Sequence, residues 1–282
     1  MQNYPIHRVI LMNTEEKHFP TELTGIWDRV EVYHLAKEEF DHGGTRDRGV
    51  RMSTADLVLC MTQDAMPADE TLIEELVKPF DDPKVWAAYA RQLPNEDCRE
   101  VEKYTRSFNY PERSMVKTKE DLDRLGIKTF FCSNVCAAWR REKYLELGGF
   151  VKHTIFNEDM ILAGTMIKQG GKIAYCAKAK VIHSHNYSAF QQFHRNFDLA
   201  VSQTMYPEVF GGIRSESEGI KLVKKSLSYC IKIGKPWLMI QVVTQSAGKL
   251  LGYKMGQRYR SLPMWLILRC TMSPSFWRGG KA

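Results

Sequence analysis

Apolar and polar positions along the chain follow two periods, which predict strands and helices in turn. Helical spacing of apolar residues covers residues 69–80 and 160–169, and a third helix is expected after residue 139, ending at Gly148 and Gly149. Strands are predicted by apolar–polar alternation at residues 30–35 and by short apolar segments at residues 9–12, 57–60, 85–90, 129–138, 173–176 and 180–182. Because strands alternate with helices, we expect an α/β fold with a largely parallel sheet.

Two segments without a clear period are predicted to be loops beside a binding surface. Residues 40–50 (FDHGGTRDRGV) combine two glycines with a histidine and two arginines, which suits a loop leading into a helix that faces phosphate. An ordinary polar loop with solvated arginines explains this composition equally well. Residues 95–119 are polar and aromatic, as in excursions that pass over a binding site.

Charge divides the chain into two parts. Twelve of the 40 Lys and Arg residues lie after Glu218, whereas Asp and Glu are absent there. Residues 1–218 carry 28 basic and 33 acidic groups, a net charge of −5. We therefore predict an acidic domain over residues 1–218 and a basic amphipathic extension over residues 219–282.

The extension suggests where the protein works. Its basic residues are interspersed with Trp, Leu, Ile and Met, which favours an anionic membrane surface as partner and argues against nucleic acid. No run of about 18 apolar residues predicts a membrane span. Seven cysteines without a metal-type cluster fit a reduced cytoplasmic compartment. We expect a cytoplasmic protein that lies peripherally on the inner face of the plasma membrane.

Three polar clusters border apolar elements and are candidates for chemistry. A carboxylate at the carboxyl end of a buried strand lies where open α/β sheets bind ligands. Carboxylates and imidazoles together suit Mg²⁺ or Mn²⁺, and a second carboxylate can act as a general base. The clusters are Gln63–Asp64, Glu158–Asp159 and His183–His185.

Each cluster alone also has a structural explanation. Asp64 could cap the helix predicted from Asp69, and Glu158–Asp159 could complement the dipole of a helix N-terminus. His183 and His185 could belong to a packed core. A metal hydrolase built on Asp64 and the two histidines is a further alternative, although no HExxH motif is present.

The combination of motifs is more specific than any one of them. They are FDHGGTRDRG (40–49), LCMTQDAMPAD (59–69), RSFNYPERS (106–114), GIKTFFCSN (126–134), ELGGF (146–150), FNEDM (156–160), VIHSHNYS (181–188), QQFHRNFD (191–198) and KLLGYKMGQRYRSLP (249–263). In this order they resemble the family 2 glycosyltransferases, and within them the rhamnosyltransferase-like bacterial enzymes. The resemblance implies a GT-A fold, with a mostly parallel sheet flanked by helices and here a helical C-terminal extension.

The resemblance also implies roles for the clusters. Asp64 matches the aspartate that binds the metal and the diphosphate, and Gln63 stands beside it where another acid could be. Asp159 matches the catalytic base, with Glu158 next to it. Either His183 or His185 is expected to be a further contact to the metal or the diphosphate.

Further matches concern the two substrates. On the donor side, His42, Thr45 and Arg46 match a segment that faces the nucleotide diphosphate, and Asn13 stands where an aspartate usually contacts the nucleotide. The resemblance also implies a strand and a helix ahead of residues 4–16, which this sequence does not contain. Acceptor contacts are expected from Asn109, Tyr110 and Trp139, because aromatic faces stack on sugar rings; packing in the core is the alternative explanation for these residues.

The implied reaction is an inverting transfer of a sugar from a nucleotide-sugar donor. The resemblance suggests dTDP-L-rhamnose as donor and a growing surface polysaccharide or lipid-linked glycan as acceptor. Asp159 would deprotonate the acceptor hydroxyl, and Mg²⁺ or Mn²⁺ at Asp64 would take up the charge of the leaving diphosphate. The alternative is a non-catalytic, degenerate glycosyltransferase-like protein that serves as a binding or scaffold protein.

Overall fold

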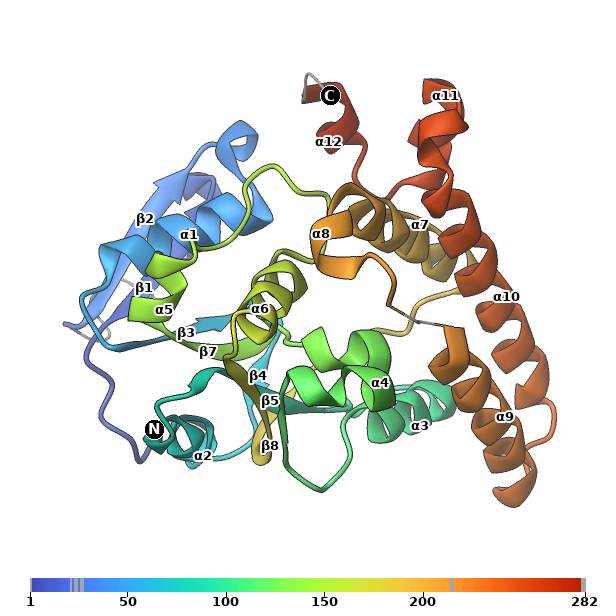
Figure 1. The fold of residues 1–282 in the computed structure, drawn as a ribbon, viewed down its shortest axis with the longest axis horizontal. Helices are drawn as coiled ribbons and strands as arrows, with labels where there is room; N and C mark the ends of the chain where they lie inside the picture. Colours follow the sequence, from blue (N-terminus) through green and yellow to red (C-terminus); the bar gives the residue numbers. More distant parts are fainter. Residues whose placement is uncertain (1, 21, 23–24, 26–27, 214–215, 280–282) are drawn as a thin grey trace.

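The computed structural model describes residues 2–20, 22, 25, 28–213 and 216–279, which form an α/β fold with two sheets (Figure 1). The larger sheet has the strand order β3-β7-β5-β8-β4, with β6 also pairing with β8. Its strands are β3 (Leu57–Met61), β4 (Met66–Pro67), β5 (Val85–Leu93), β6 (Met115–Lys117), β7 (Cys136–Arg140) and β8 (Lys172–Ile182). The α/β class is therefore confirmed.

The larger sheet is mixed rather than mostly parallel. β5 and β8 run parallel, but β7 is inserted antiparallel between β3 and β5. The short strands β4 and β6 also pair antiparallel with β8. The two strands predicted at residues 173–176 and 180–182 form the single strand β8, with a register shift between them opposite Ala90 and Arg91.

Helices cover both faces of this sheet. On one face, α2 (Leu72–Val77) buries Leu72 and Leu76 against small strand residues such as Ala88 and Ala138. On the other face, α6 (Glu158–Lys168) packs in a core with Trp139. The remaining helices of this part are α3 (Glu100–Asn109), α4 (Leu122–Leu125), α5 (Arg141–Glu146), α7 (Ala189–Met205) and α8 (Pro207–Phe210). Short 3-10 helices span Glu16–His18, Lys37–Glu39, Lys78–Asp81, Lys119–Asp121, Gly126–Phe130 and Tyr259–Ser261.

The smaller sheet consists of β1 (Val9–Thr14) and β2 (Val30–Leu35), which pair in parallel. In the described parts of the chain no strand lies between β1 and β3, and both strands line one cavity. Their sequences, VILM and LVLC, are apolar on both faces like interior strands. Every side chain in these two strands is nevertheless only partly buried.

Two predicted segments differ from the structure for identifiable reasons. The strand predicted at residues 129–138 begins only at Cys136, because Asn134 and Val135 form a turn after the 3-10 helix, closed by a hydrogen bond from the N–H of Cys136 to the carbonyl oxygen of Ser133. The loop predicted at residues 40–50 is mostly α1 (His42–Met52). Its glycines allow close packing, since a Cβ at Gly43 would lie 1.9 Å from the carbonyl oxygen of Val151.

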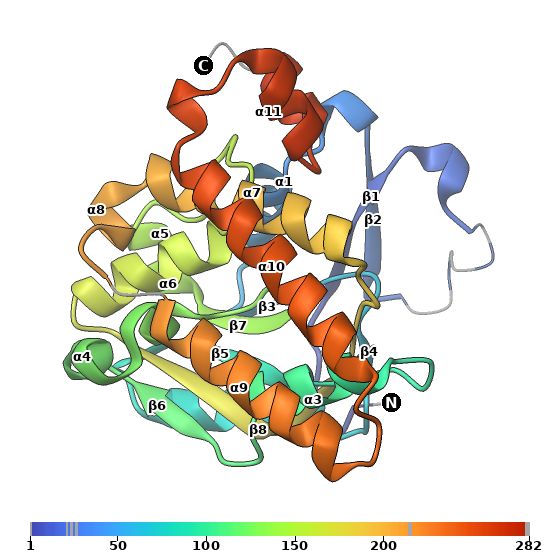
Figure 2. The ribbon, with the colours of Figure 1, turned by 90° about the vertical axis from the view of Figure 1, so that its right-hand side faces the viewer.

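The C-terminal extension is helical, as expected, and packs directly on the rest of the chain (Figure 2). α10 crosses α7 and approaches it closely through Gly248, Gly252 and Gly256. A Cβ at Gly252 would lie 2.1 Å from the carbonyl oxygen of Phe193. The helices are α9 (Glu216–Lys232), α10 (Leu238–Gln257), α11 (Met264–Cys270) and α12 (Pro274–Gly279).

α9 completes the contact by packing on α3. Cys230 and Val242 are buried with Val101, and the rings of Tyr104 and Tyr229 stack with centroids 4.3 Å apart. None of the described helices combines the length and the apolar character needed to cross a bilayer. The division at residue 218 stays a prediction.

Candidate active site

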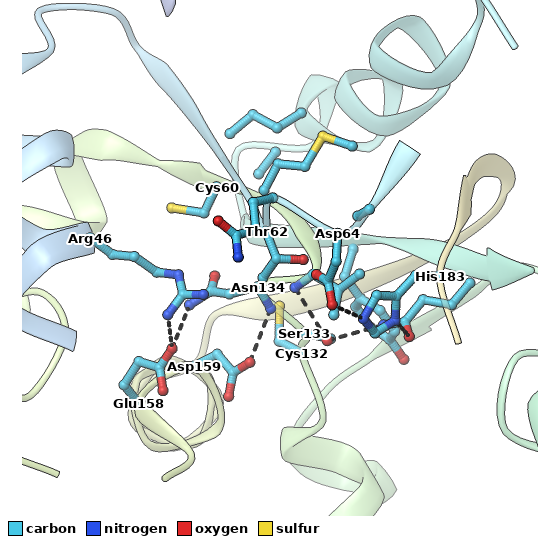
Figure 3. A pocket seen from close by; sticks show the side chains of 18 of the residues that line it. Arg46, Cys60, Thr62, Asp64, Cys132, Ser133, Asn134, Glu158, Asp159 and His183 are labelled. Carbon is cyan, nitrogen blue, oxygen red and sulfur yellow. Dashed lines mark hydrogen bonds and ion pairs between the residues drawn. The ribbon is translucent and has the colours of Figure 1, made fainter. Parts of the chain in front are cut away.

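A cavity of about 2250 Å³ extends from the smaller sheet, past the end of β3, to α7 and α10. All three polar clusters predicted from the sequence line it. In Figure 3, Arg46 and Glu158 lie on one side, Asp64 and His183 on the other, and Asn134 between them. The fold therefore brings together residues that are more than 100 positions apart in sequence.

Asp64, His183 and His185 form one cluster. Nε2 of each histidine lies 3.4 Å from Oδ2 of Asp64, and one ligand atom from each residue falls within 4.8 Å of the others. The short strand β4 explains the placement: Met66 pairs with Ile182, so the turn that carries Asp64 is held beside the residues that follow β8.

The charges of this cluster suit a divalent cation. Burial lowers the pKa of His183 to about 4 and also lowers the pKa of His185, so both rings are neutral near pH 7 and can ligate metal. The pKa of Asp64 is lowered despite partial burial, because hydrogen bonding and the adjacent histidines favour the carboxylate. Oxygen with imidazole nitrogen suits Mn²⁺ better than Mg²⁺.

The environment of the cluster supports this interpretation. Nδ1 of His183 lies 3.0 Å from Oε1 of Gln92, which orients the ring so that Nε2 faces Asp64. Asp64 does not cap α2, because that helix begins at Leu72 and Asp69 accepts the local hydrogen bonds from Thr71 instead. The capping alternative is thereby excluded.

Asp159 is held at the start of α6 with its carboxylate toward the cavity. Asn157, in the left-handed conformation with φ 67°, turns the chain into the helix. Oδ2 of Asp159 accepts a hydrogen bond from the backbone N–H of Asn134 at 3.0 Å. Burial, and next the negative charge of Glu158, raise the pKa of Asp159 to about 7. A carboxylate with such a pKa can accept a proton efficiently near neutral pH.

Glu158 occupies a different environment. Its Oε1 accepts hydrogen bonds from Nη1 of Arg46 at 2.8 Å and from Nδ2 of Asn134 at 3.3 Å. Asn134 is fixed in turn by the indole N–H of Trp139, which donates to its Oδ1 at 3.1 Å. The Glu158 carboxylate is therefore neutralised by an ion pair, whereas Asp159 has no such cation partner in the described structure.

The other predicted residues divide into two groups. Those that line the cavity are Asn13, His42, Thr45, Arg46, Gln63, Asn109 and Tyr110. Tyr110 is largely core, 6% exposed and packed against Phe131 and Tyr175. Trp139 is fully buried and is not among the cavity-lining residues. Its contact with Asn134 gives it a structural role, and it is not placed to contact an acceptor in the cavity.

Two site residues, Asn134 and Gln92, were not predicted from the sequence. Gln92 lies in β5 and bonds to both His183 and Arg106, and Asn134 bonds to Glu158 and, through its backbone, to Asp159. Both are amides that interrupt mainly apolar segments, Gln92 near the end of β5 and Asn134 in the turn before β7. That interruption is the signal that could have identified them, because buried polar groups need partners.

Comparison with known proteins agrees with this geometry. Residues 2–148 match the family described as glycosyl transferase family 2. The chain is 39% identical over 278 residues to the O-antigen chain rhamnosyltransferase RfbN of Salmonella typhimurium, covering 97% of this chain and 87% of that protein. It is 40% identical over 247 residues to the O-antigen chain rhamnosyltransferase WbaN of Salmonella anatum, covering 86% and 78%.

Solved structures share the fold at low sequence identity. The mannosyltransferase PcManGT from Pyrobaculum calidifontis, in complex with GDP-Man and Mn²⁺, has a TM-score of 0.53 at 14% identity, covering 99% of this chain and 81% of that one. Residues 1–349 of S. aureus TarS have a TM-score of 0.51 at 11% identity, covering 92% and 84%.

Proposed function

The chain belongs to glycosyl transferase family 2 and is a glycosyltransferase, and we propose that it transfers L-rhamnose from dTDP-L-rhamnose onto a growing O-antigen-type polysaccharide. The observation that carries the proposal is the convergence of Asp159, with a pKa near 7, and the Asp64–His183–His185 cluster on one cavity. The names of the two rhamnosyltransferase relatives support the choice of sugar.

The proposed reaction is a single displacement at the anomeric carbon. The acceptor hydroxyl forms the new C–O bond while the bond from the sugar to the nucleotide diphosphate breaks, so the configuration inverts. Asp159 takes the hydroxyl proton. The N–H of Asn134 fixes one oxygen of this carboxylate, and the Arg46–Glu158 ion pair limits the competing negative charge beside it.

Asp64, His183 and His185 would hold a divalent cation, which when bound neutralises charge on the nucleotide diphosphate. Their atoms fit such an ion, because one carboxylate oxygen and two imidazole nitrogens lie within 4.8 Å of one another. The chain itself keeps both imidazoles neutral by burial and fixes the ring of His183 through Gln92. We propose Mn²⁺ as the better match and Mg²⁺ as the alternative.

The remaining cavity residues are assigned by position. We place the nucleotide diphosphate near the start of α1, where His42 and Thr45 line the cavity, with Gln63 and Asn13 on the same donor side. Arg46 lines the same side of the cavity while its Nη1 pairs with Glu158. Asn109 and the edge of Tyr110 are left for the acceptor.

Donor choice gives the direct test of this function. The purified chain, incubated with Mn²⁺ and a lipid-linked O-antigen intermediate that lacks its rhamnose, should incorporate label from dTDP-L-rhamnose. GDP-mannose and dTDP-glucose serve as controls and should give little incorporation. Equal use of GDP-mannose would contradict the donor assignment. Absence of metal-dependent nucleotide binding, together with no turnover of any donor, would favour the non-catalytic alternative.

The C-terminal helices support a peripheral membrane location, which we propose to be the anionic inner face of the plasma membrane. Residues 219–282, which include nearly all of these helices, contain twelve Lys and Arg residues and no Asp or Glu. Each basic residue near such a surface contributes about 1 kcal/mol. Large apolar side chains are exposed beside them: Ile220, Ile231, Trp237, Ile240, Val243, Leu250, Leu251, Met264, Trp265 and Met272.

Replacing Trp237 and Ile240 with serine should weaken binding to vesicles that contain anionic lipid by about tenfold or more, because buried apolar area is lost. The two side chains are 63% and 72% exposed, so the fold should survive. Val116→Ser, an exposed apolar site on β6, is the matched control. Co-sedimentation gives the measurement. Unchanged binding of the double variant, or equal binding to neutral vesicles, would contradict the proposal.

A further inference from the structure

Three cations that the proposed reaction does not use line the end of the cavity where α3, α7 and α10 meet. They are Arg106 on α3, Arg195 on α7 and Lys249 on α10. Arg106 pairs with Glu102, whose Oε1 lies 2.8 Å from its Nε. Within the described parts of the chain, neither Arg195 nor Lys249 has an ion pair or a side-chain hydrogen bond. The group therefore has more positive charge than its neighbours balance.

The fold holds these cations in place. The guanidinium of Arg195 lies 4.7 Å from the ring centroid of Phe156 and 5.7 Å from that of Tyr187, positions typical of cation–π contacts. Lys249 follows Gly248, one of the glycines that bring α10 against α7. Burial lowers the pKa of Lys249. The negative charge of Glu102 raises this pKa, whereas the positive charges of Arg195 and Arg106 lower it further. A nearby anion would stabilise the charged form of this lysine.

The group lies next to the proposed metal cluster but uses different side chains. Arg106 donates a hydrogen bond to Oε1 of Gln92, the same atom that contacts His183. The ring of Tyr187, which contacts Arg195, lies 5.0 Å from the ring of His185. An anion held by the three cations would therefore sit beside the donor diphosphate, on the side of α7 and α10.

We propose that Arg106, Arg195 and Lys249 bind the diphosphate that joins a glycan acceptor to its lipid carrier. This rests on the proposed function, which assigns the Asp64 cluster to the donor. Guanidinium groups bind phosphate oxygens in pairs, and an ammonium adds a point charge. Lys249 belongs to the same helix whose outer side exposes Ile240, Val243 and Leu251, which suits a diphosphate attached to a lipid.

A nucleoside diphosphate contains the same chemical group, so the test separates the two sources. The full chain is titrated with farnesyl diphosphate in EDTA, and separately with dTDP in Mn²⁺. Arg195→Gln and Lys249→Gln should each weaken farnesyl diphosphate binding about tenfold or more. Binding of dTDP with Mn²⁺ should change little. Lys232→Gln, an exposed lysine of the same extension, is the matched control, and farnesol controls for the apolar tail.

The two titrations distinguish a site for a lipid-linked diphosphate from a part of the donor site. If both variants weaken dTDP binding as much as farnesyl diphosphate binding, the cations belong to the donor site and the proposal is overturned. Farnesyl diphosphate binding no tighter than farnesol would overturn it as well. Should the chain fail to turn over dTDP-L-rhamnose, farnesyl diphosphate binding that Lys249→Gln weakens would still support the diphosphate site. Lys249→Gln also decides the result if Arg195→Gln does not fold.

Discussion

Replacing Asp159 with asparagine should abolish sugar transfer while donor binding remains. Asparagine is nearly isosteric with aspartate, and its side-chain oxygen can still accept the hydrogen bond from the N–H of Asn134. It cannot accept a proton at neutral pH. A well-placed general base contributes ~10²–10⁴-fold in rate, so a loss of that order in kcat is expected. Calorimetry should show donor affinity close to that of the parent.

The pH dependence gives a second measurement on Asp159. Because burial raises its pKa to about 7, the rate of the parent should rise as pH increases through that value, where the base becomes ionised. The folding stability should change with pH in the opposite direction to the rate. A folded-state pKa above 3.8, the ordinary value of an aspartate, means that the folded protein binds this proton more tightly than the unfolded chain does, so this contribution to stability is lost as pH rises through about 7. Asp159→Asn should therefore lose less stability between pH 5 and 8.

Glu158→Gln is the paired control. It removes the charge that pairs with Arg46, whose side chain is 21% exposed, and leaves that cation without its partner. We expect lower thermal stability and a smaller loss of transfer than in Asp159→Asn. If Glu158→Gln is inactive while Asp159→Asn still transfers, the two roles are exchanged. Parent-like rates in both variants would contradict the proposed mechanism.

Asp64→Ala should remove metal-dependent donor binding. Asp64 is the one carboxylate of its cluster, and loss of a ligand should cost at least as much as loss of an outer-shell partner, about 10–100-fold in metal affinity. Titration of dTDP-L-rhamnose with and without Mn²⁺ measures this. The side chain is 46% exposed and caps no helix, so the melting temperature should stay close to the parent value.

Gln63→Ala is the matched control for Asp64→Ala. Gln63 is an exposed neighbour in the same turn and also lines the cavity, but it supplies no atom to the cluster. Its substitution should leave the response to Mn²⁺ largely intact. If Asp64→Ala binds donor with the same metal dependence as Gln63→Ala, the cation is held elsewhere.

The sequence predicted individual elements better than it predicted their pairing. The strand at residues 30–35 was predicted with the bounds that β2 has, because apolar and polar positions alternate along it. The direction of β7 could not be predicted, since it depends on pairing with β3 and β5 far away in sequence. The same holds for β1 and β3, whose interior-type sequences do not indicate that one edge of each is unpaired among the described residues.

The site shows a similar division. Asp64, Asp159 and the two histidines were identified because they border apolar elements and match family motifs. The pairing of Arg46 with Glu158 was not identified from the sequence, because it joins α1 to α6 across 112 positions. The expected contact of Arg46 with the donor stays a prediction, and the three-dimensional arrangement adds that its guanidinium pairs with Glu158 rather than with Asp159.

The glycine spacing of α10 has a consequence for acceptor length. Gly248, Gly252 and Gly256 bring α10 so close to α7 that a Cβ at any of them would meet a backbone carbonyl oxygen of α7, so we expect the outer side of α10 to keep a fixed position relative to the cavity. If that outer side rests on a bilayer, Asp159 stands at a constant height above the lipid. A glycan could then be extended only when its terminal hydroxyl reaches that height. The enzyme would thus select acceptors by the number of sugars between the lipid and the growing end of the glycan.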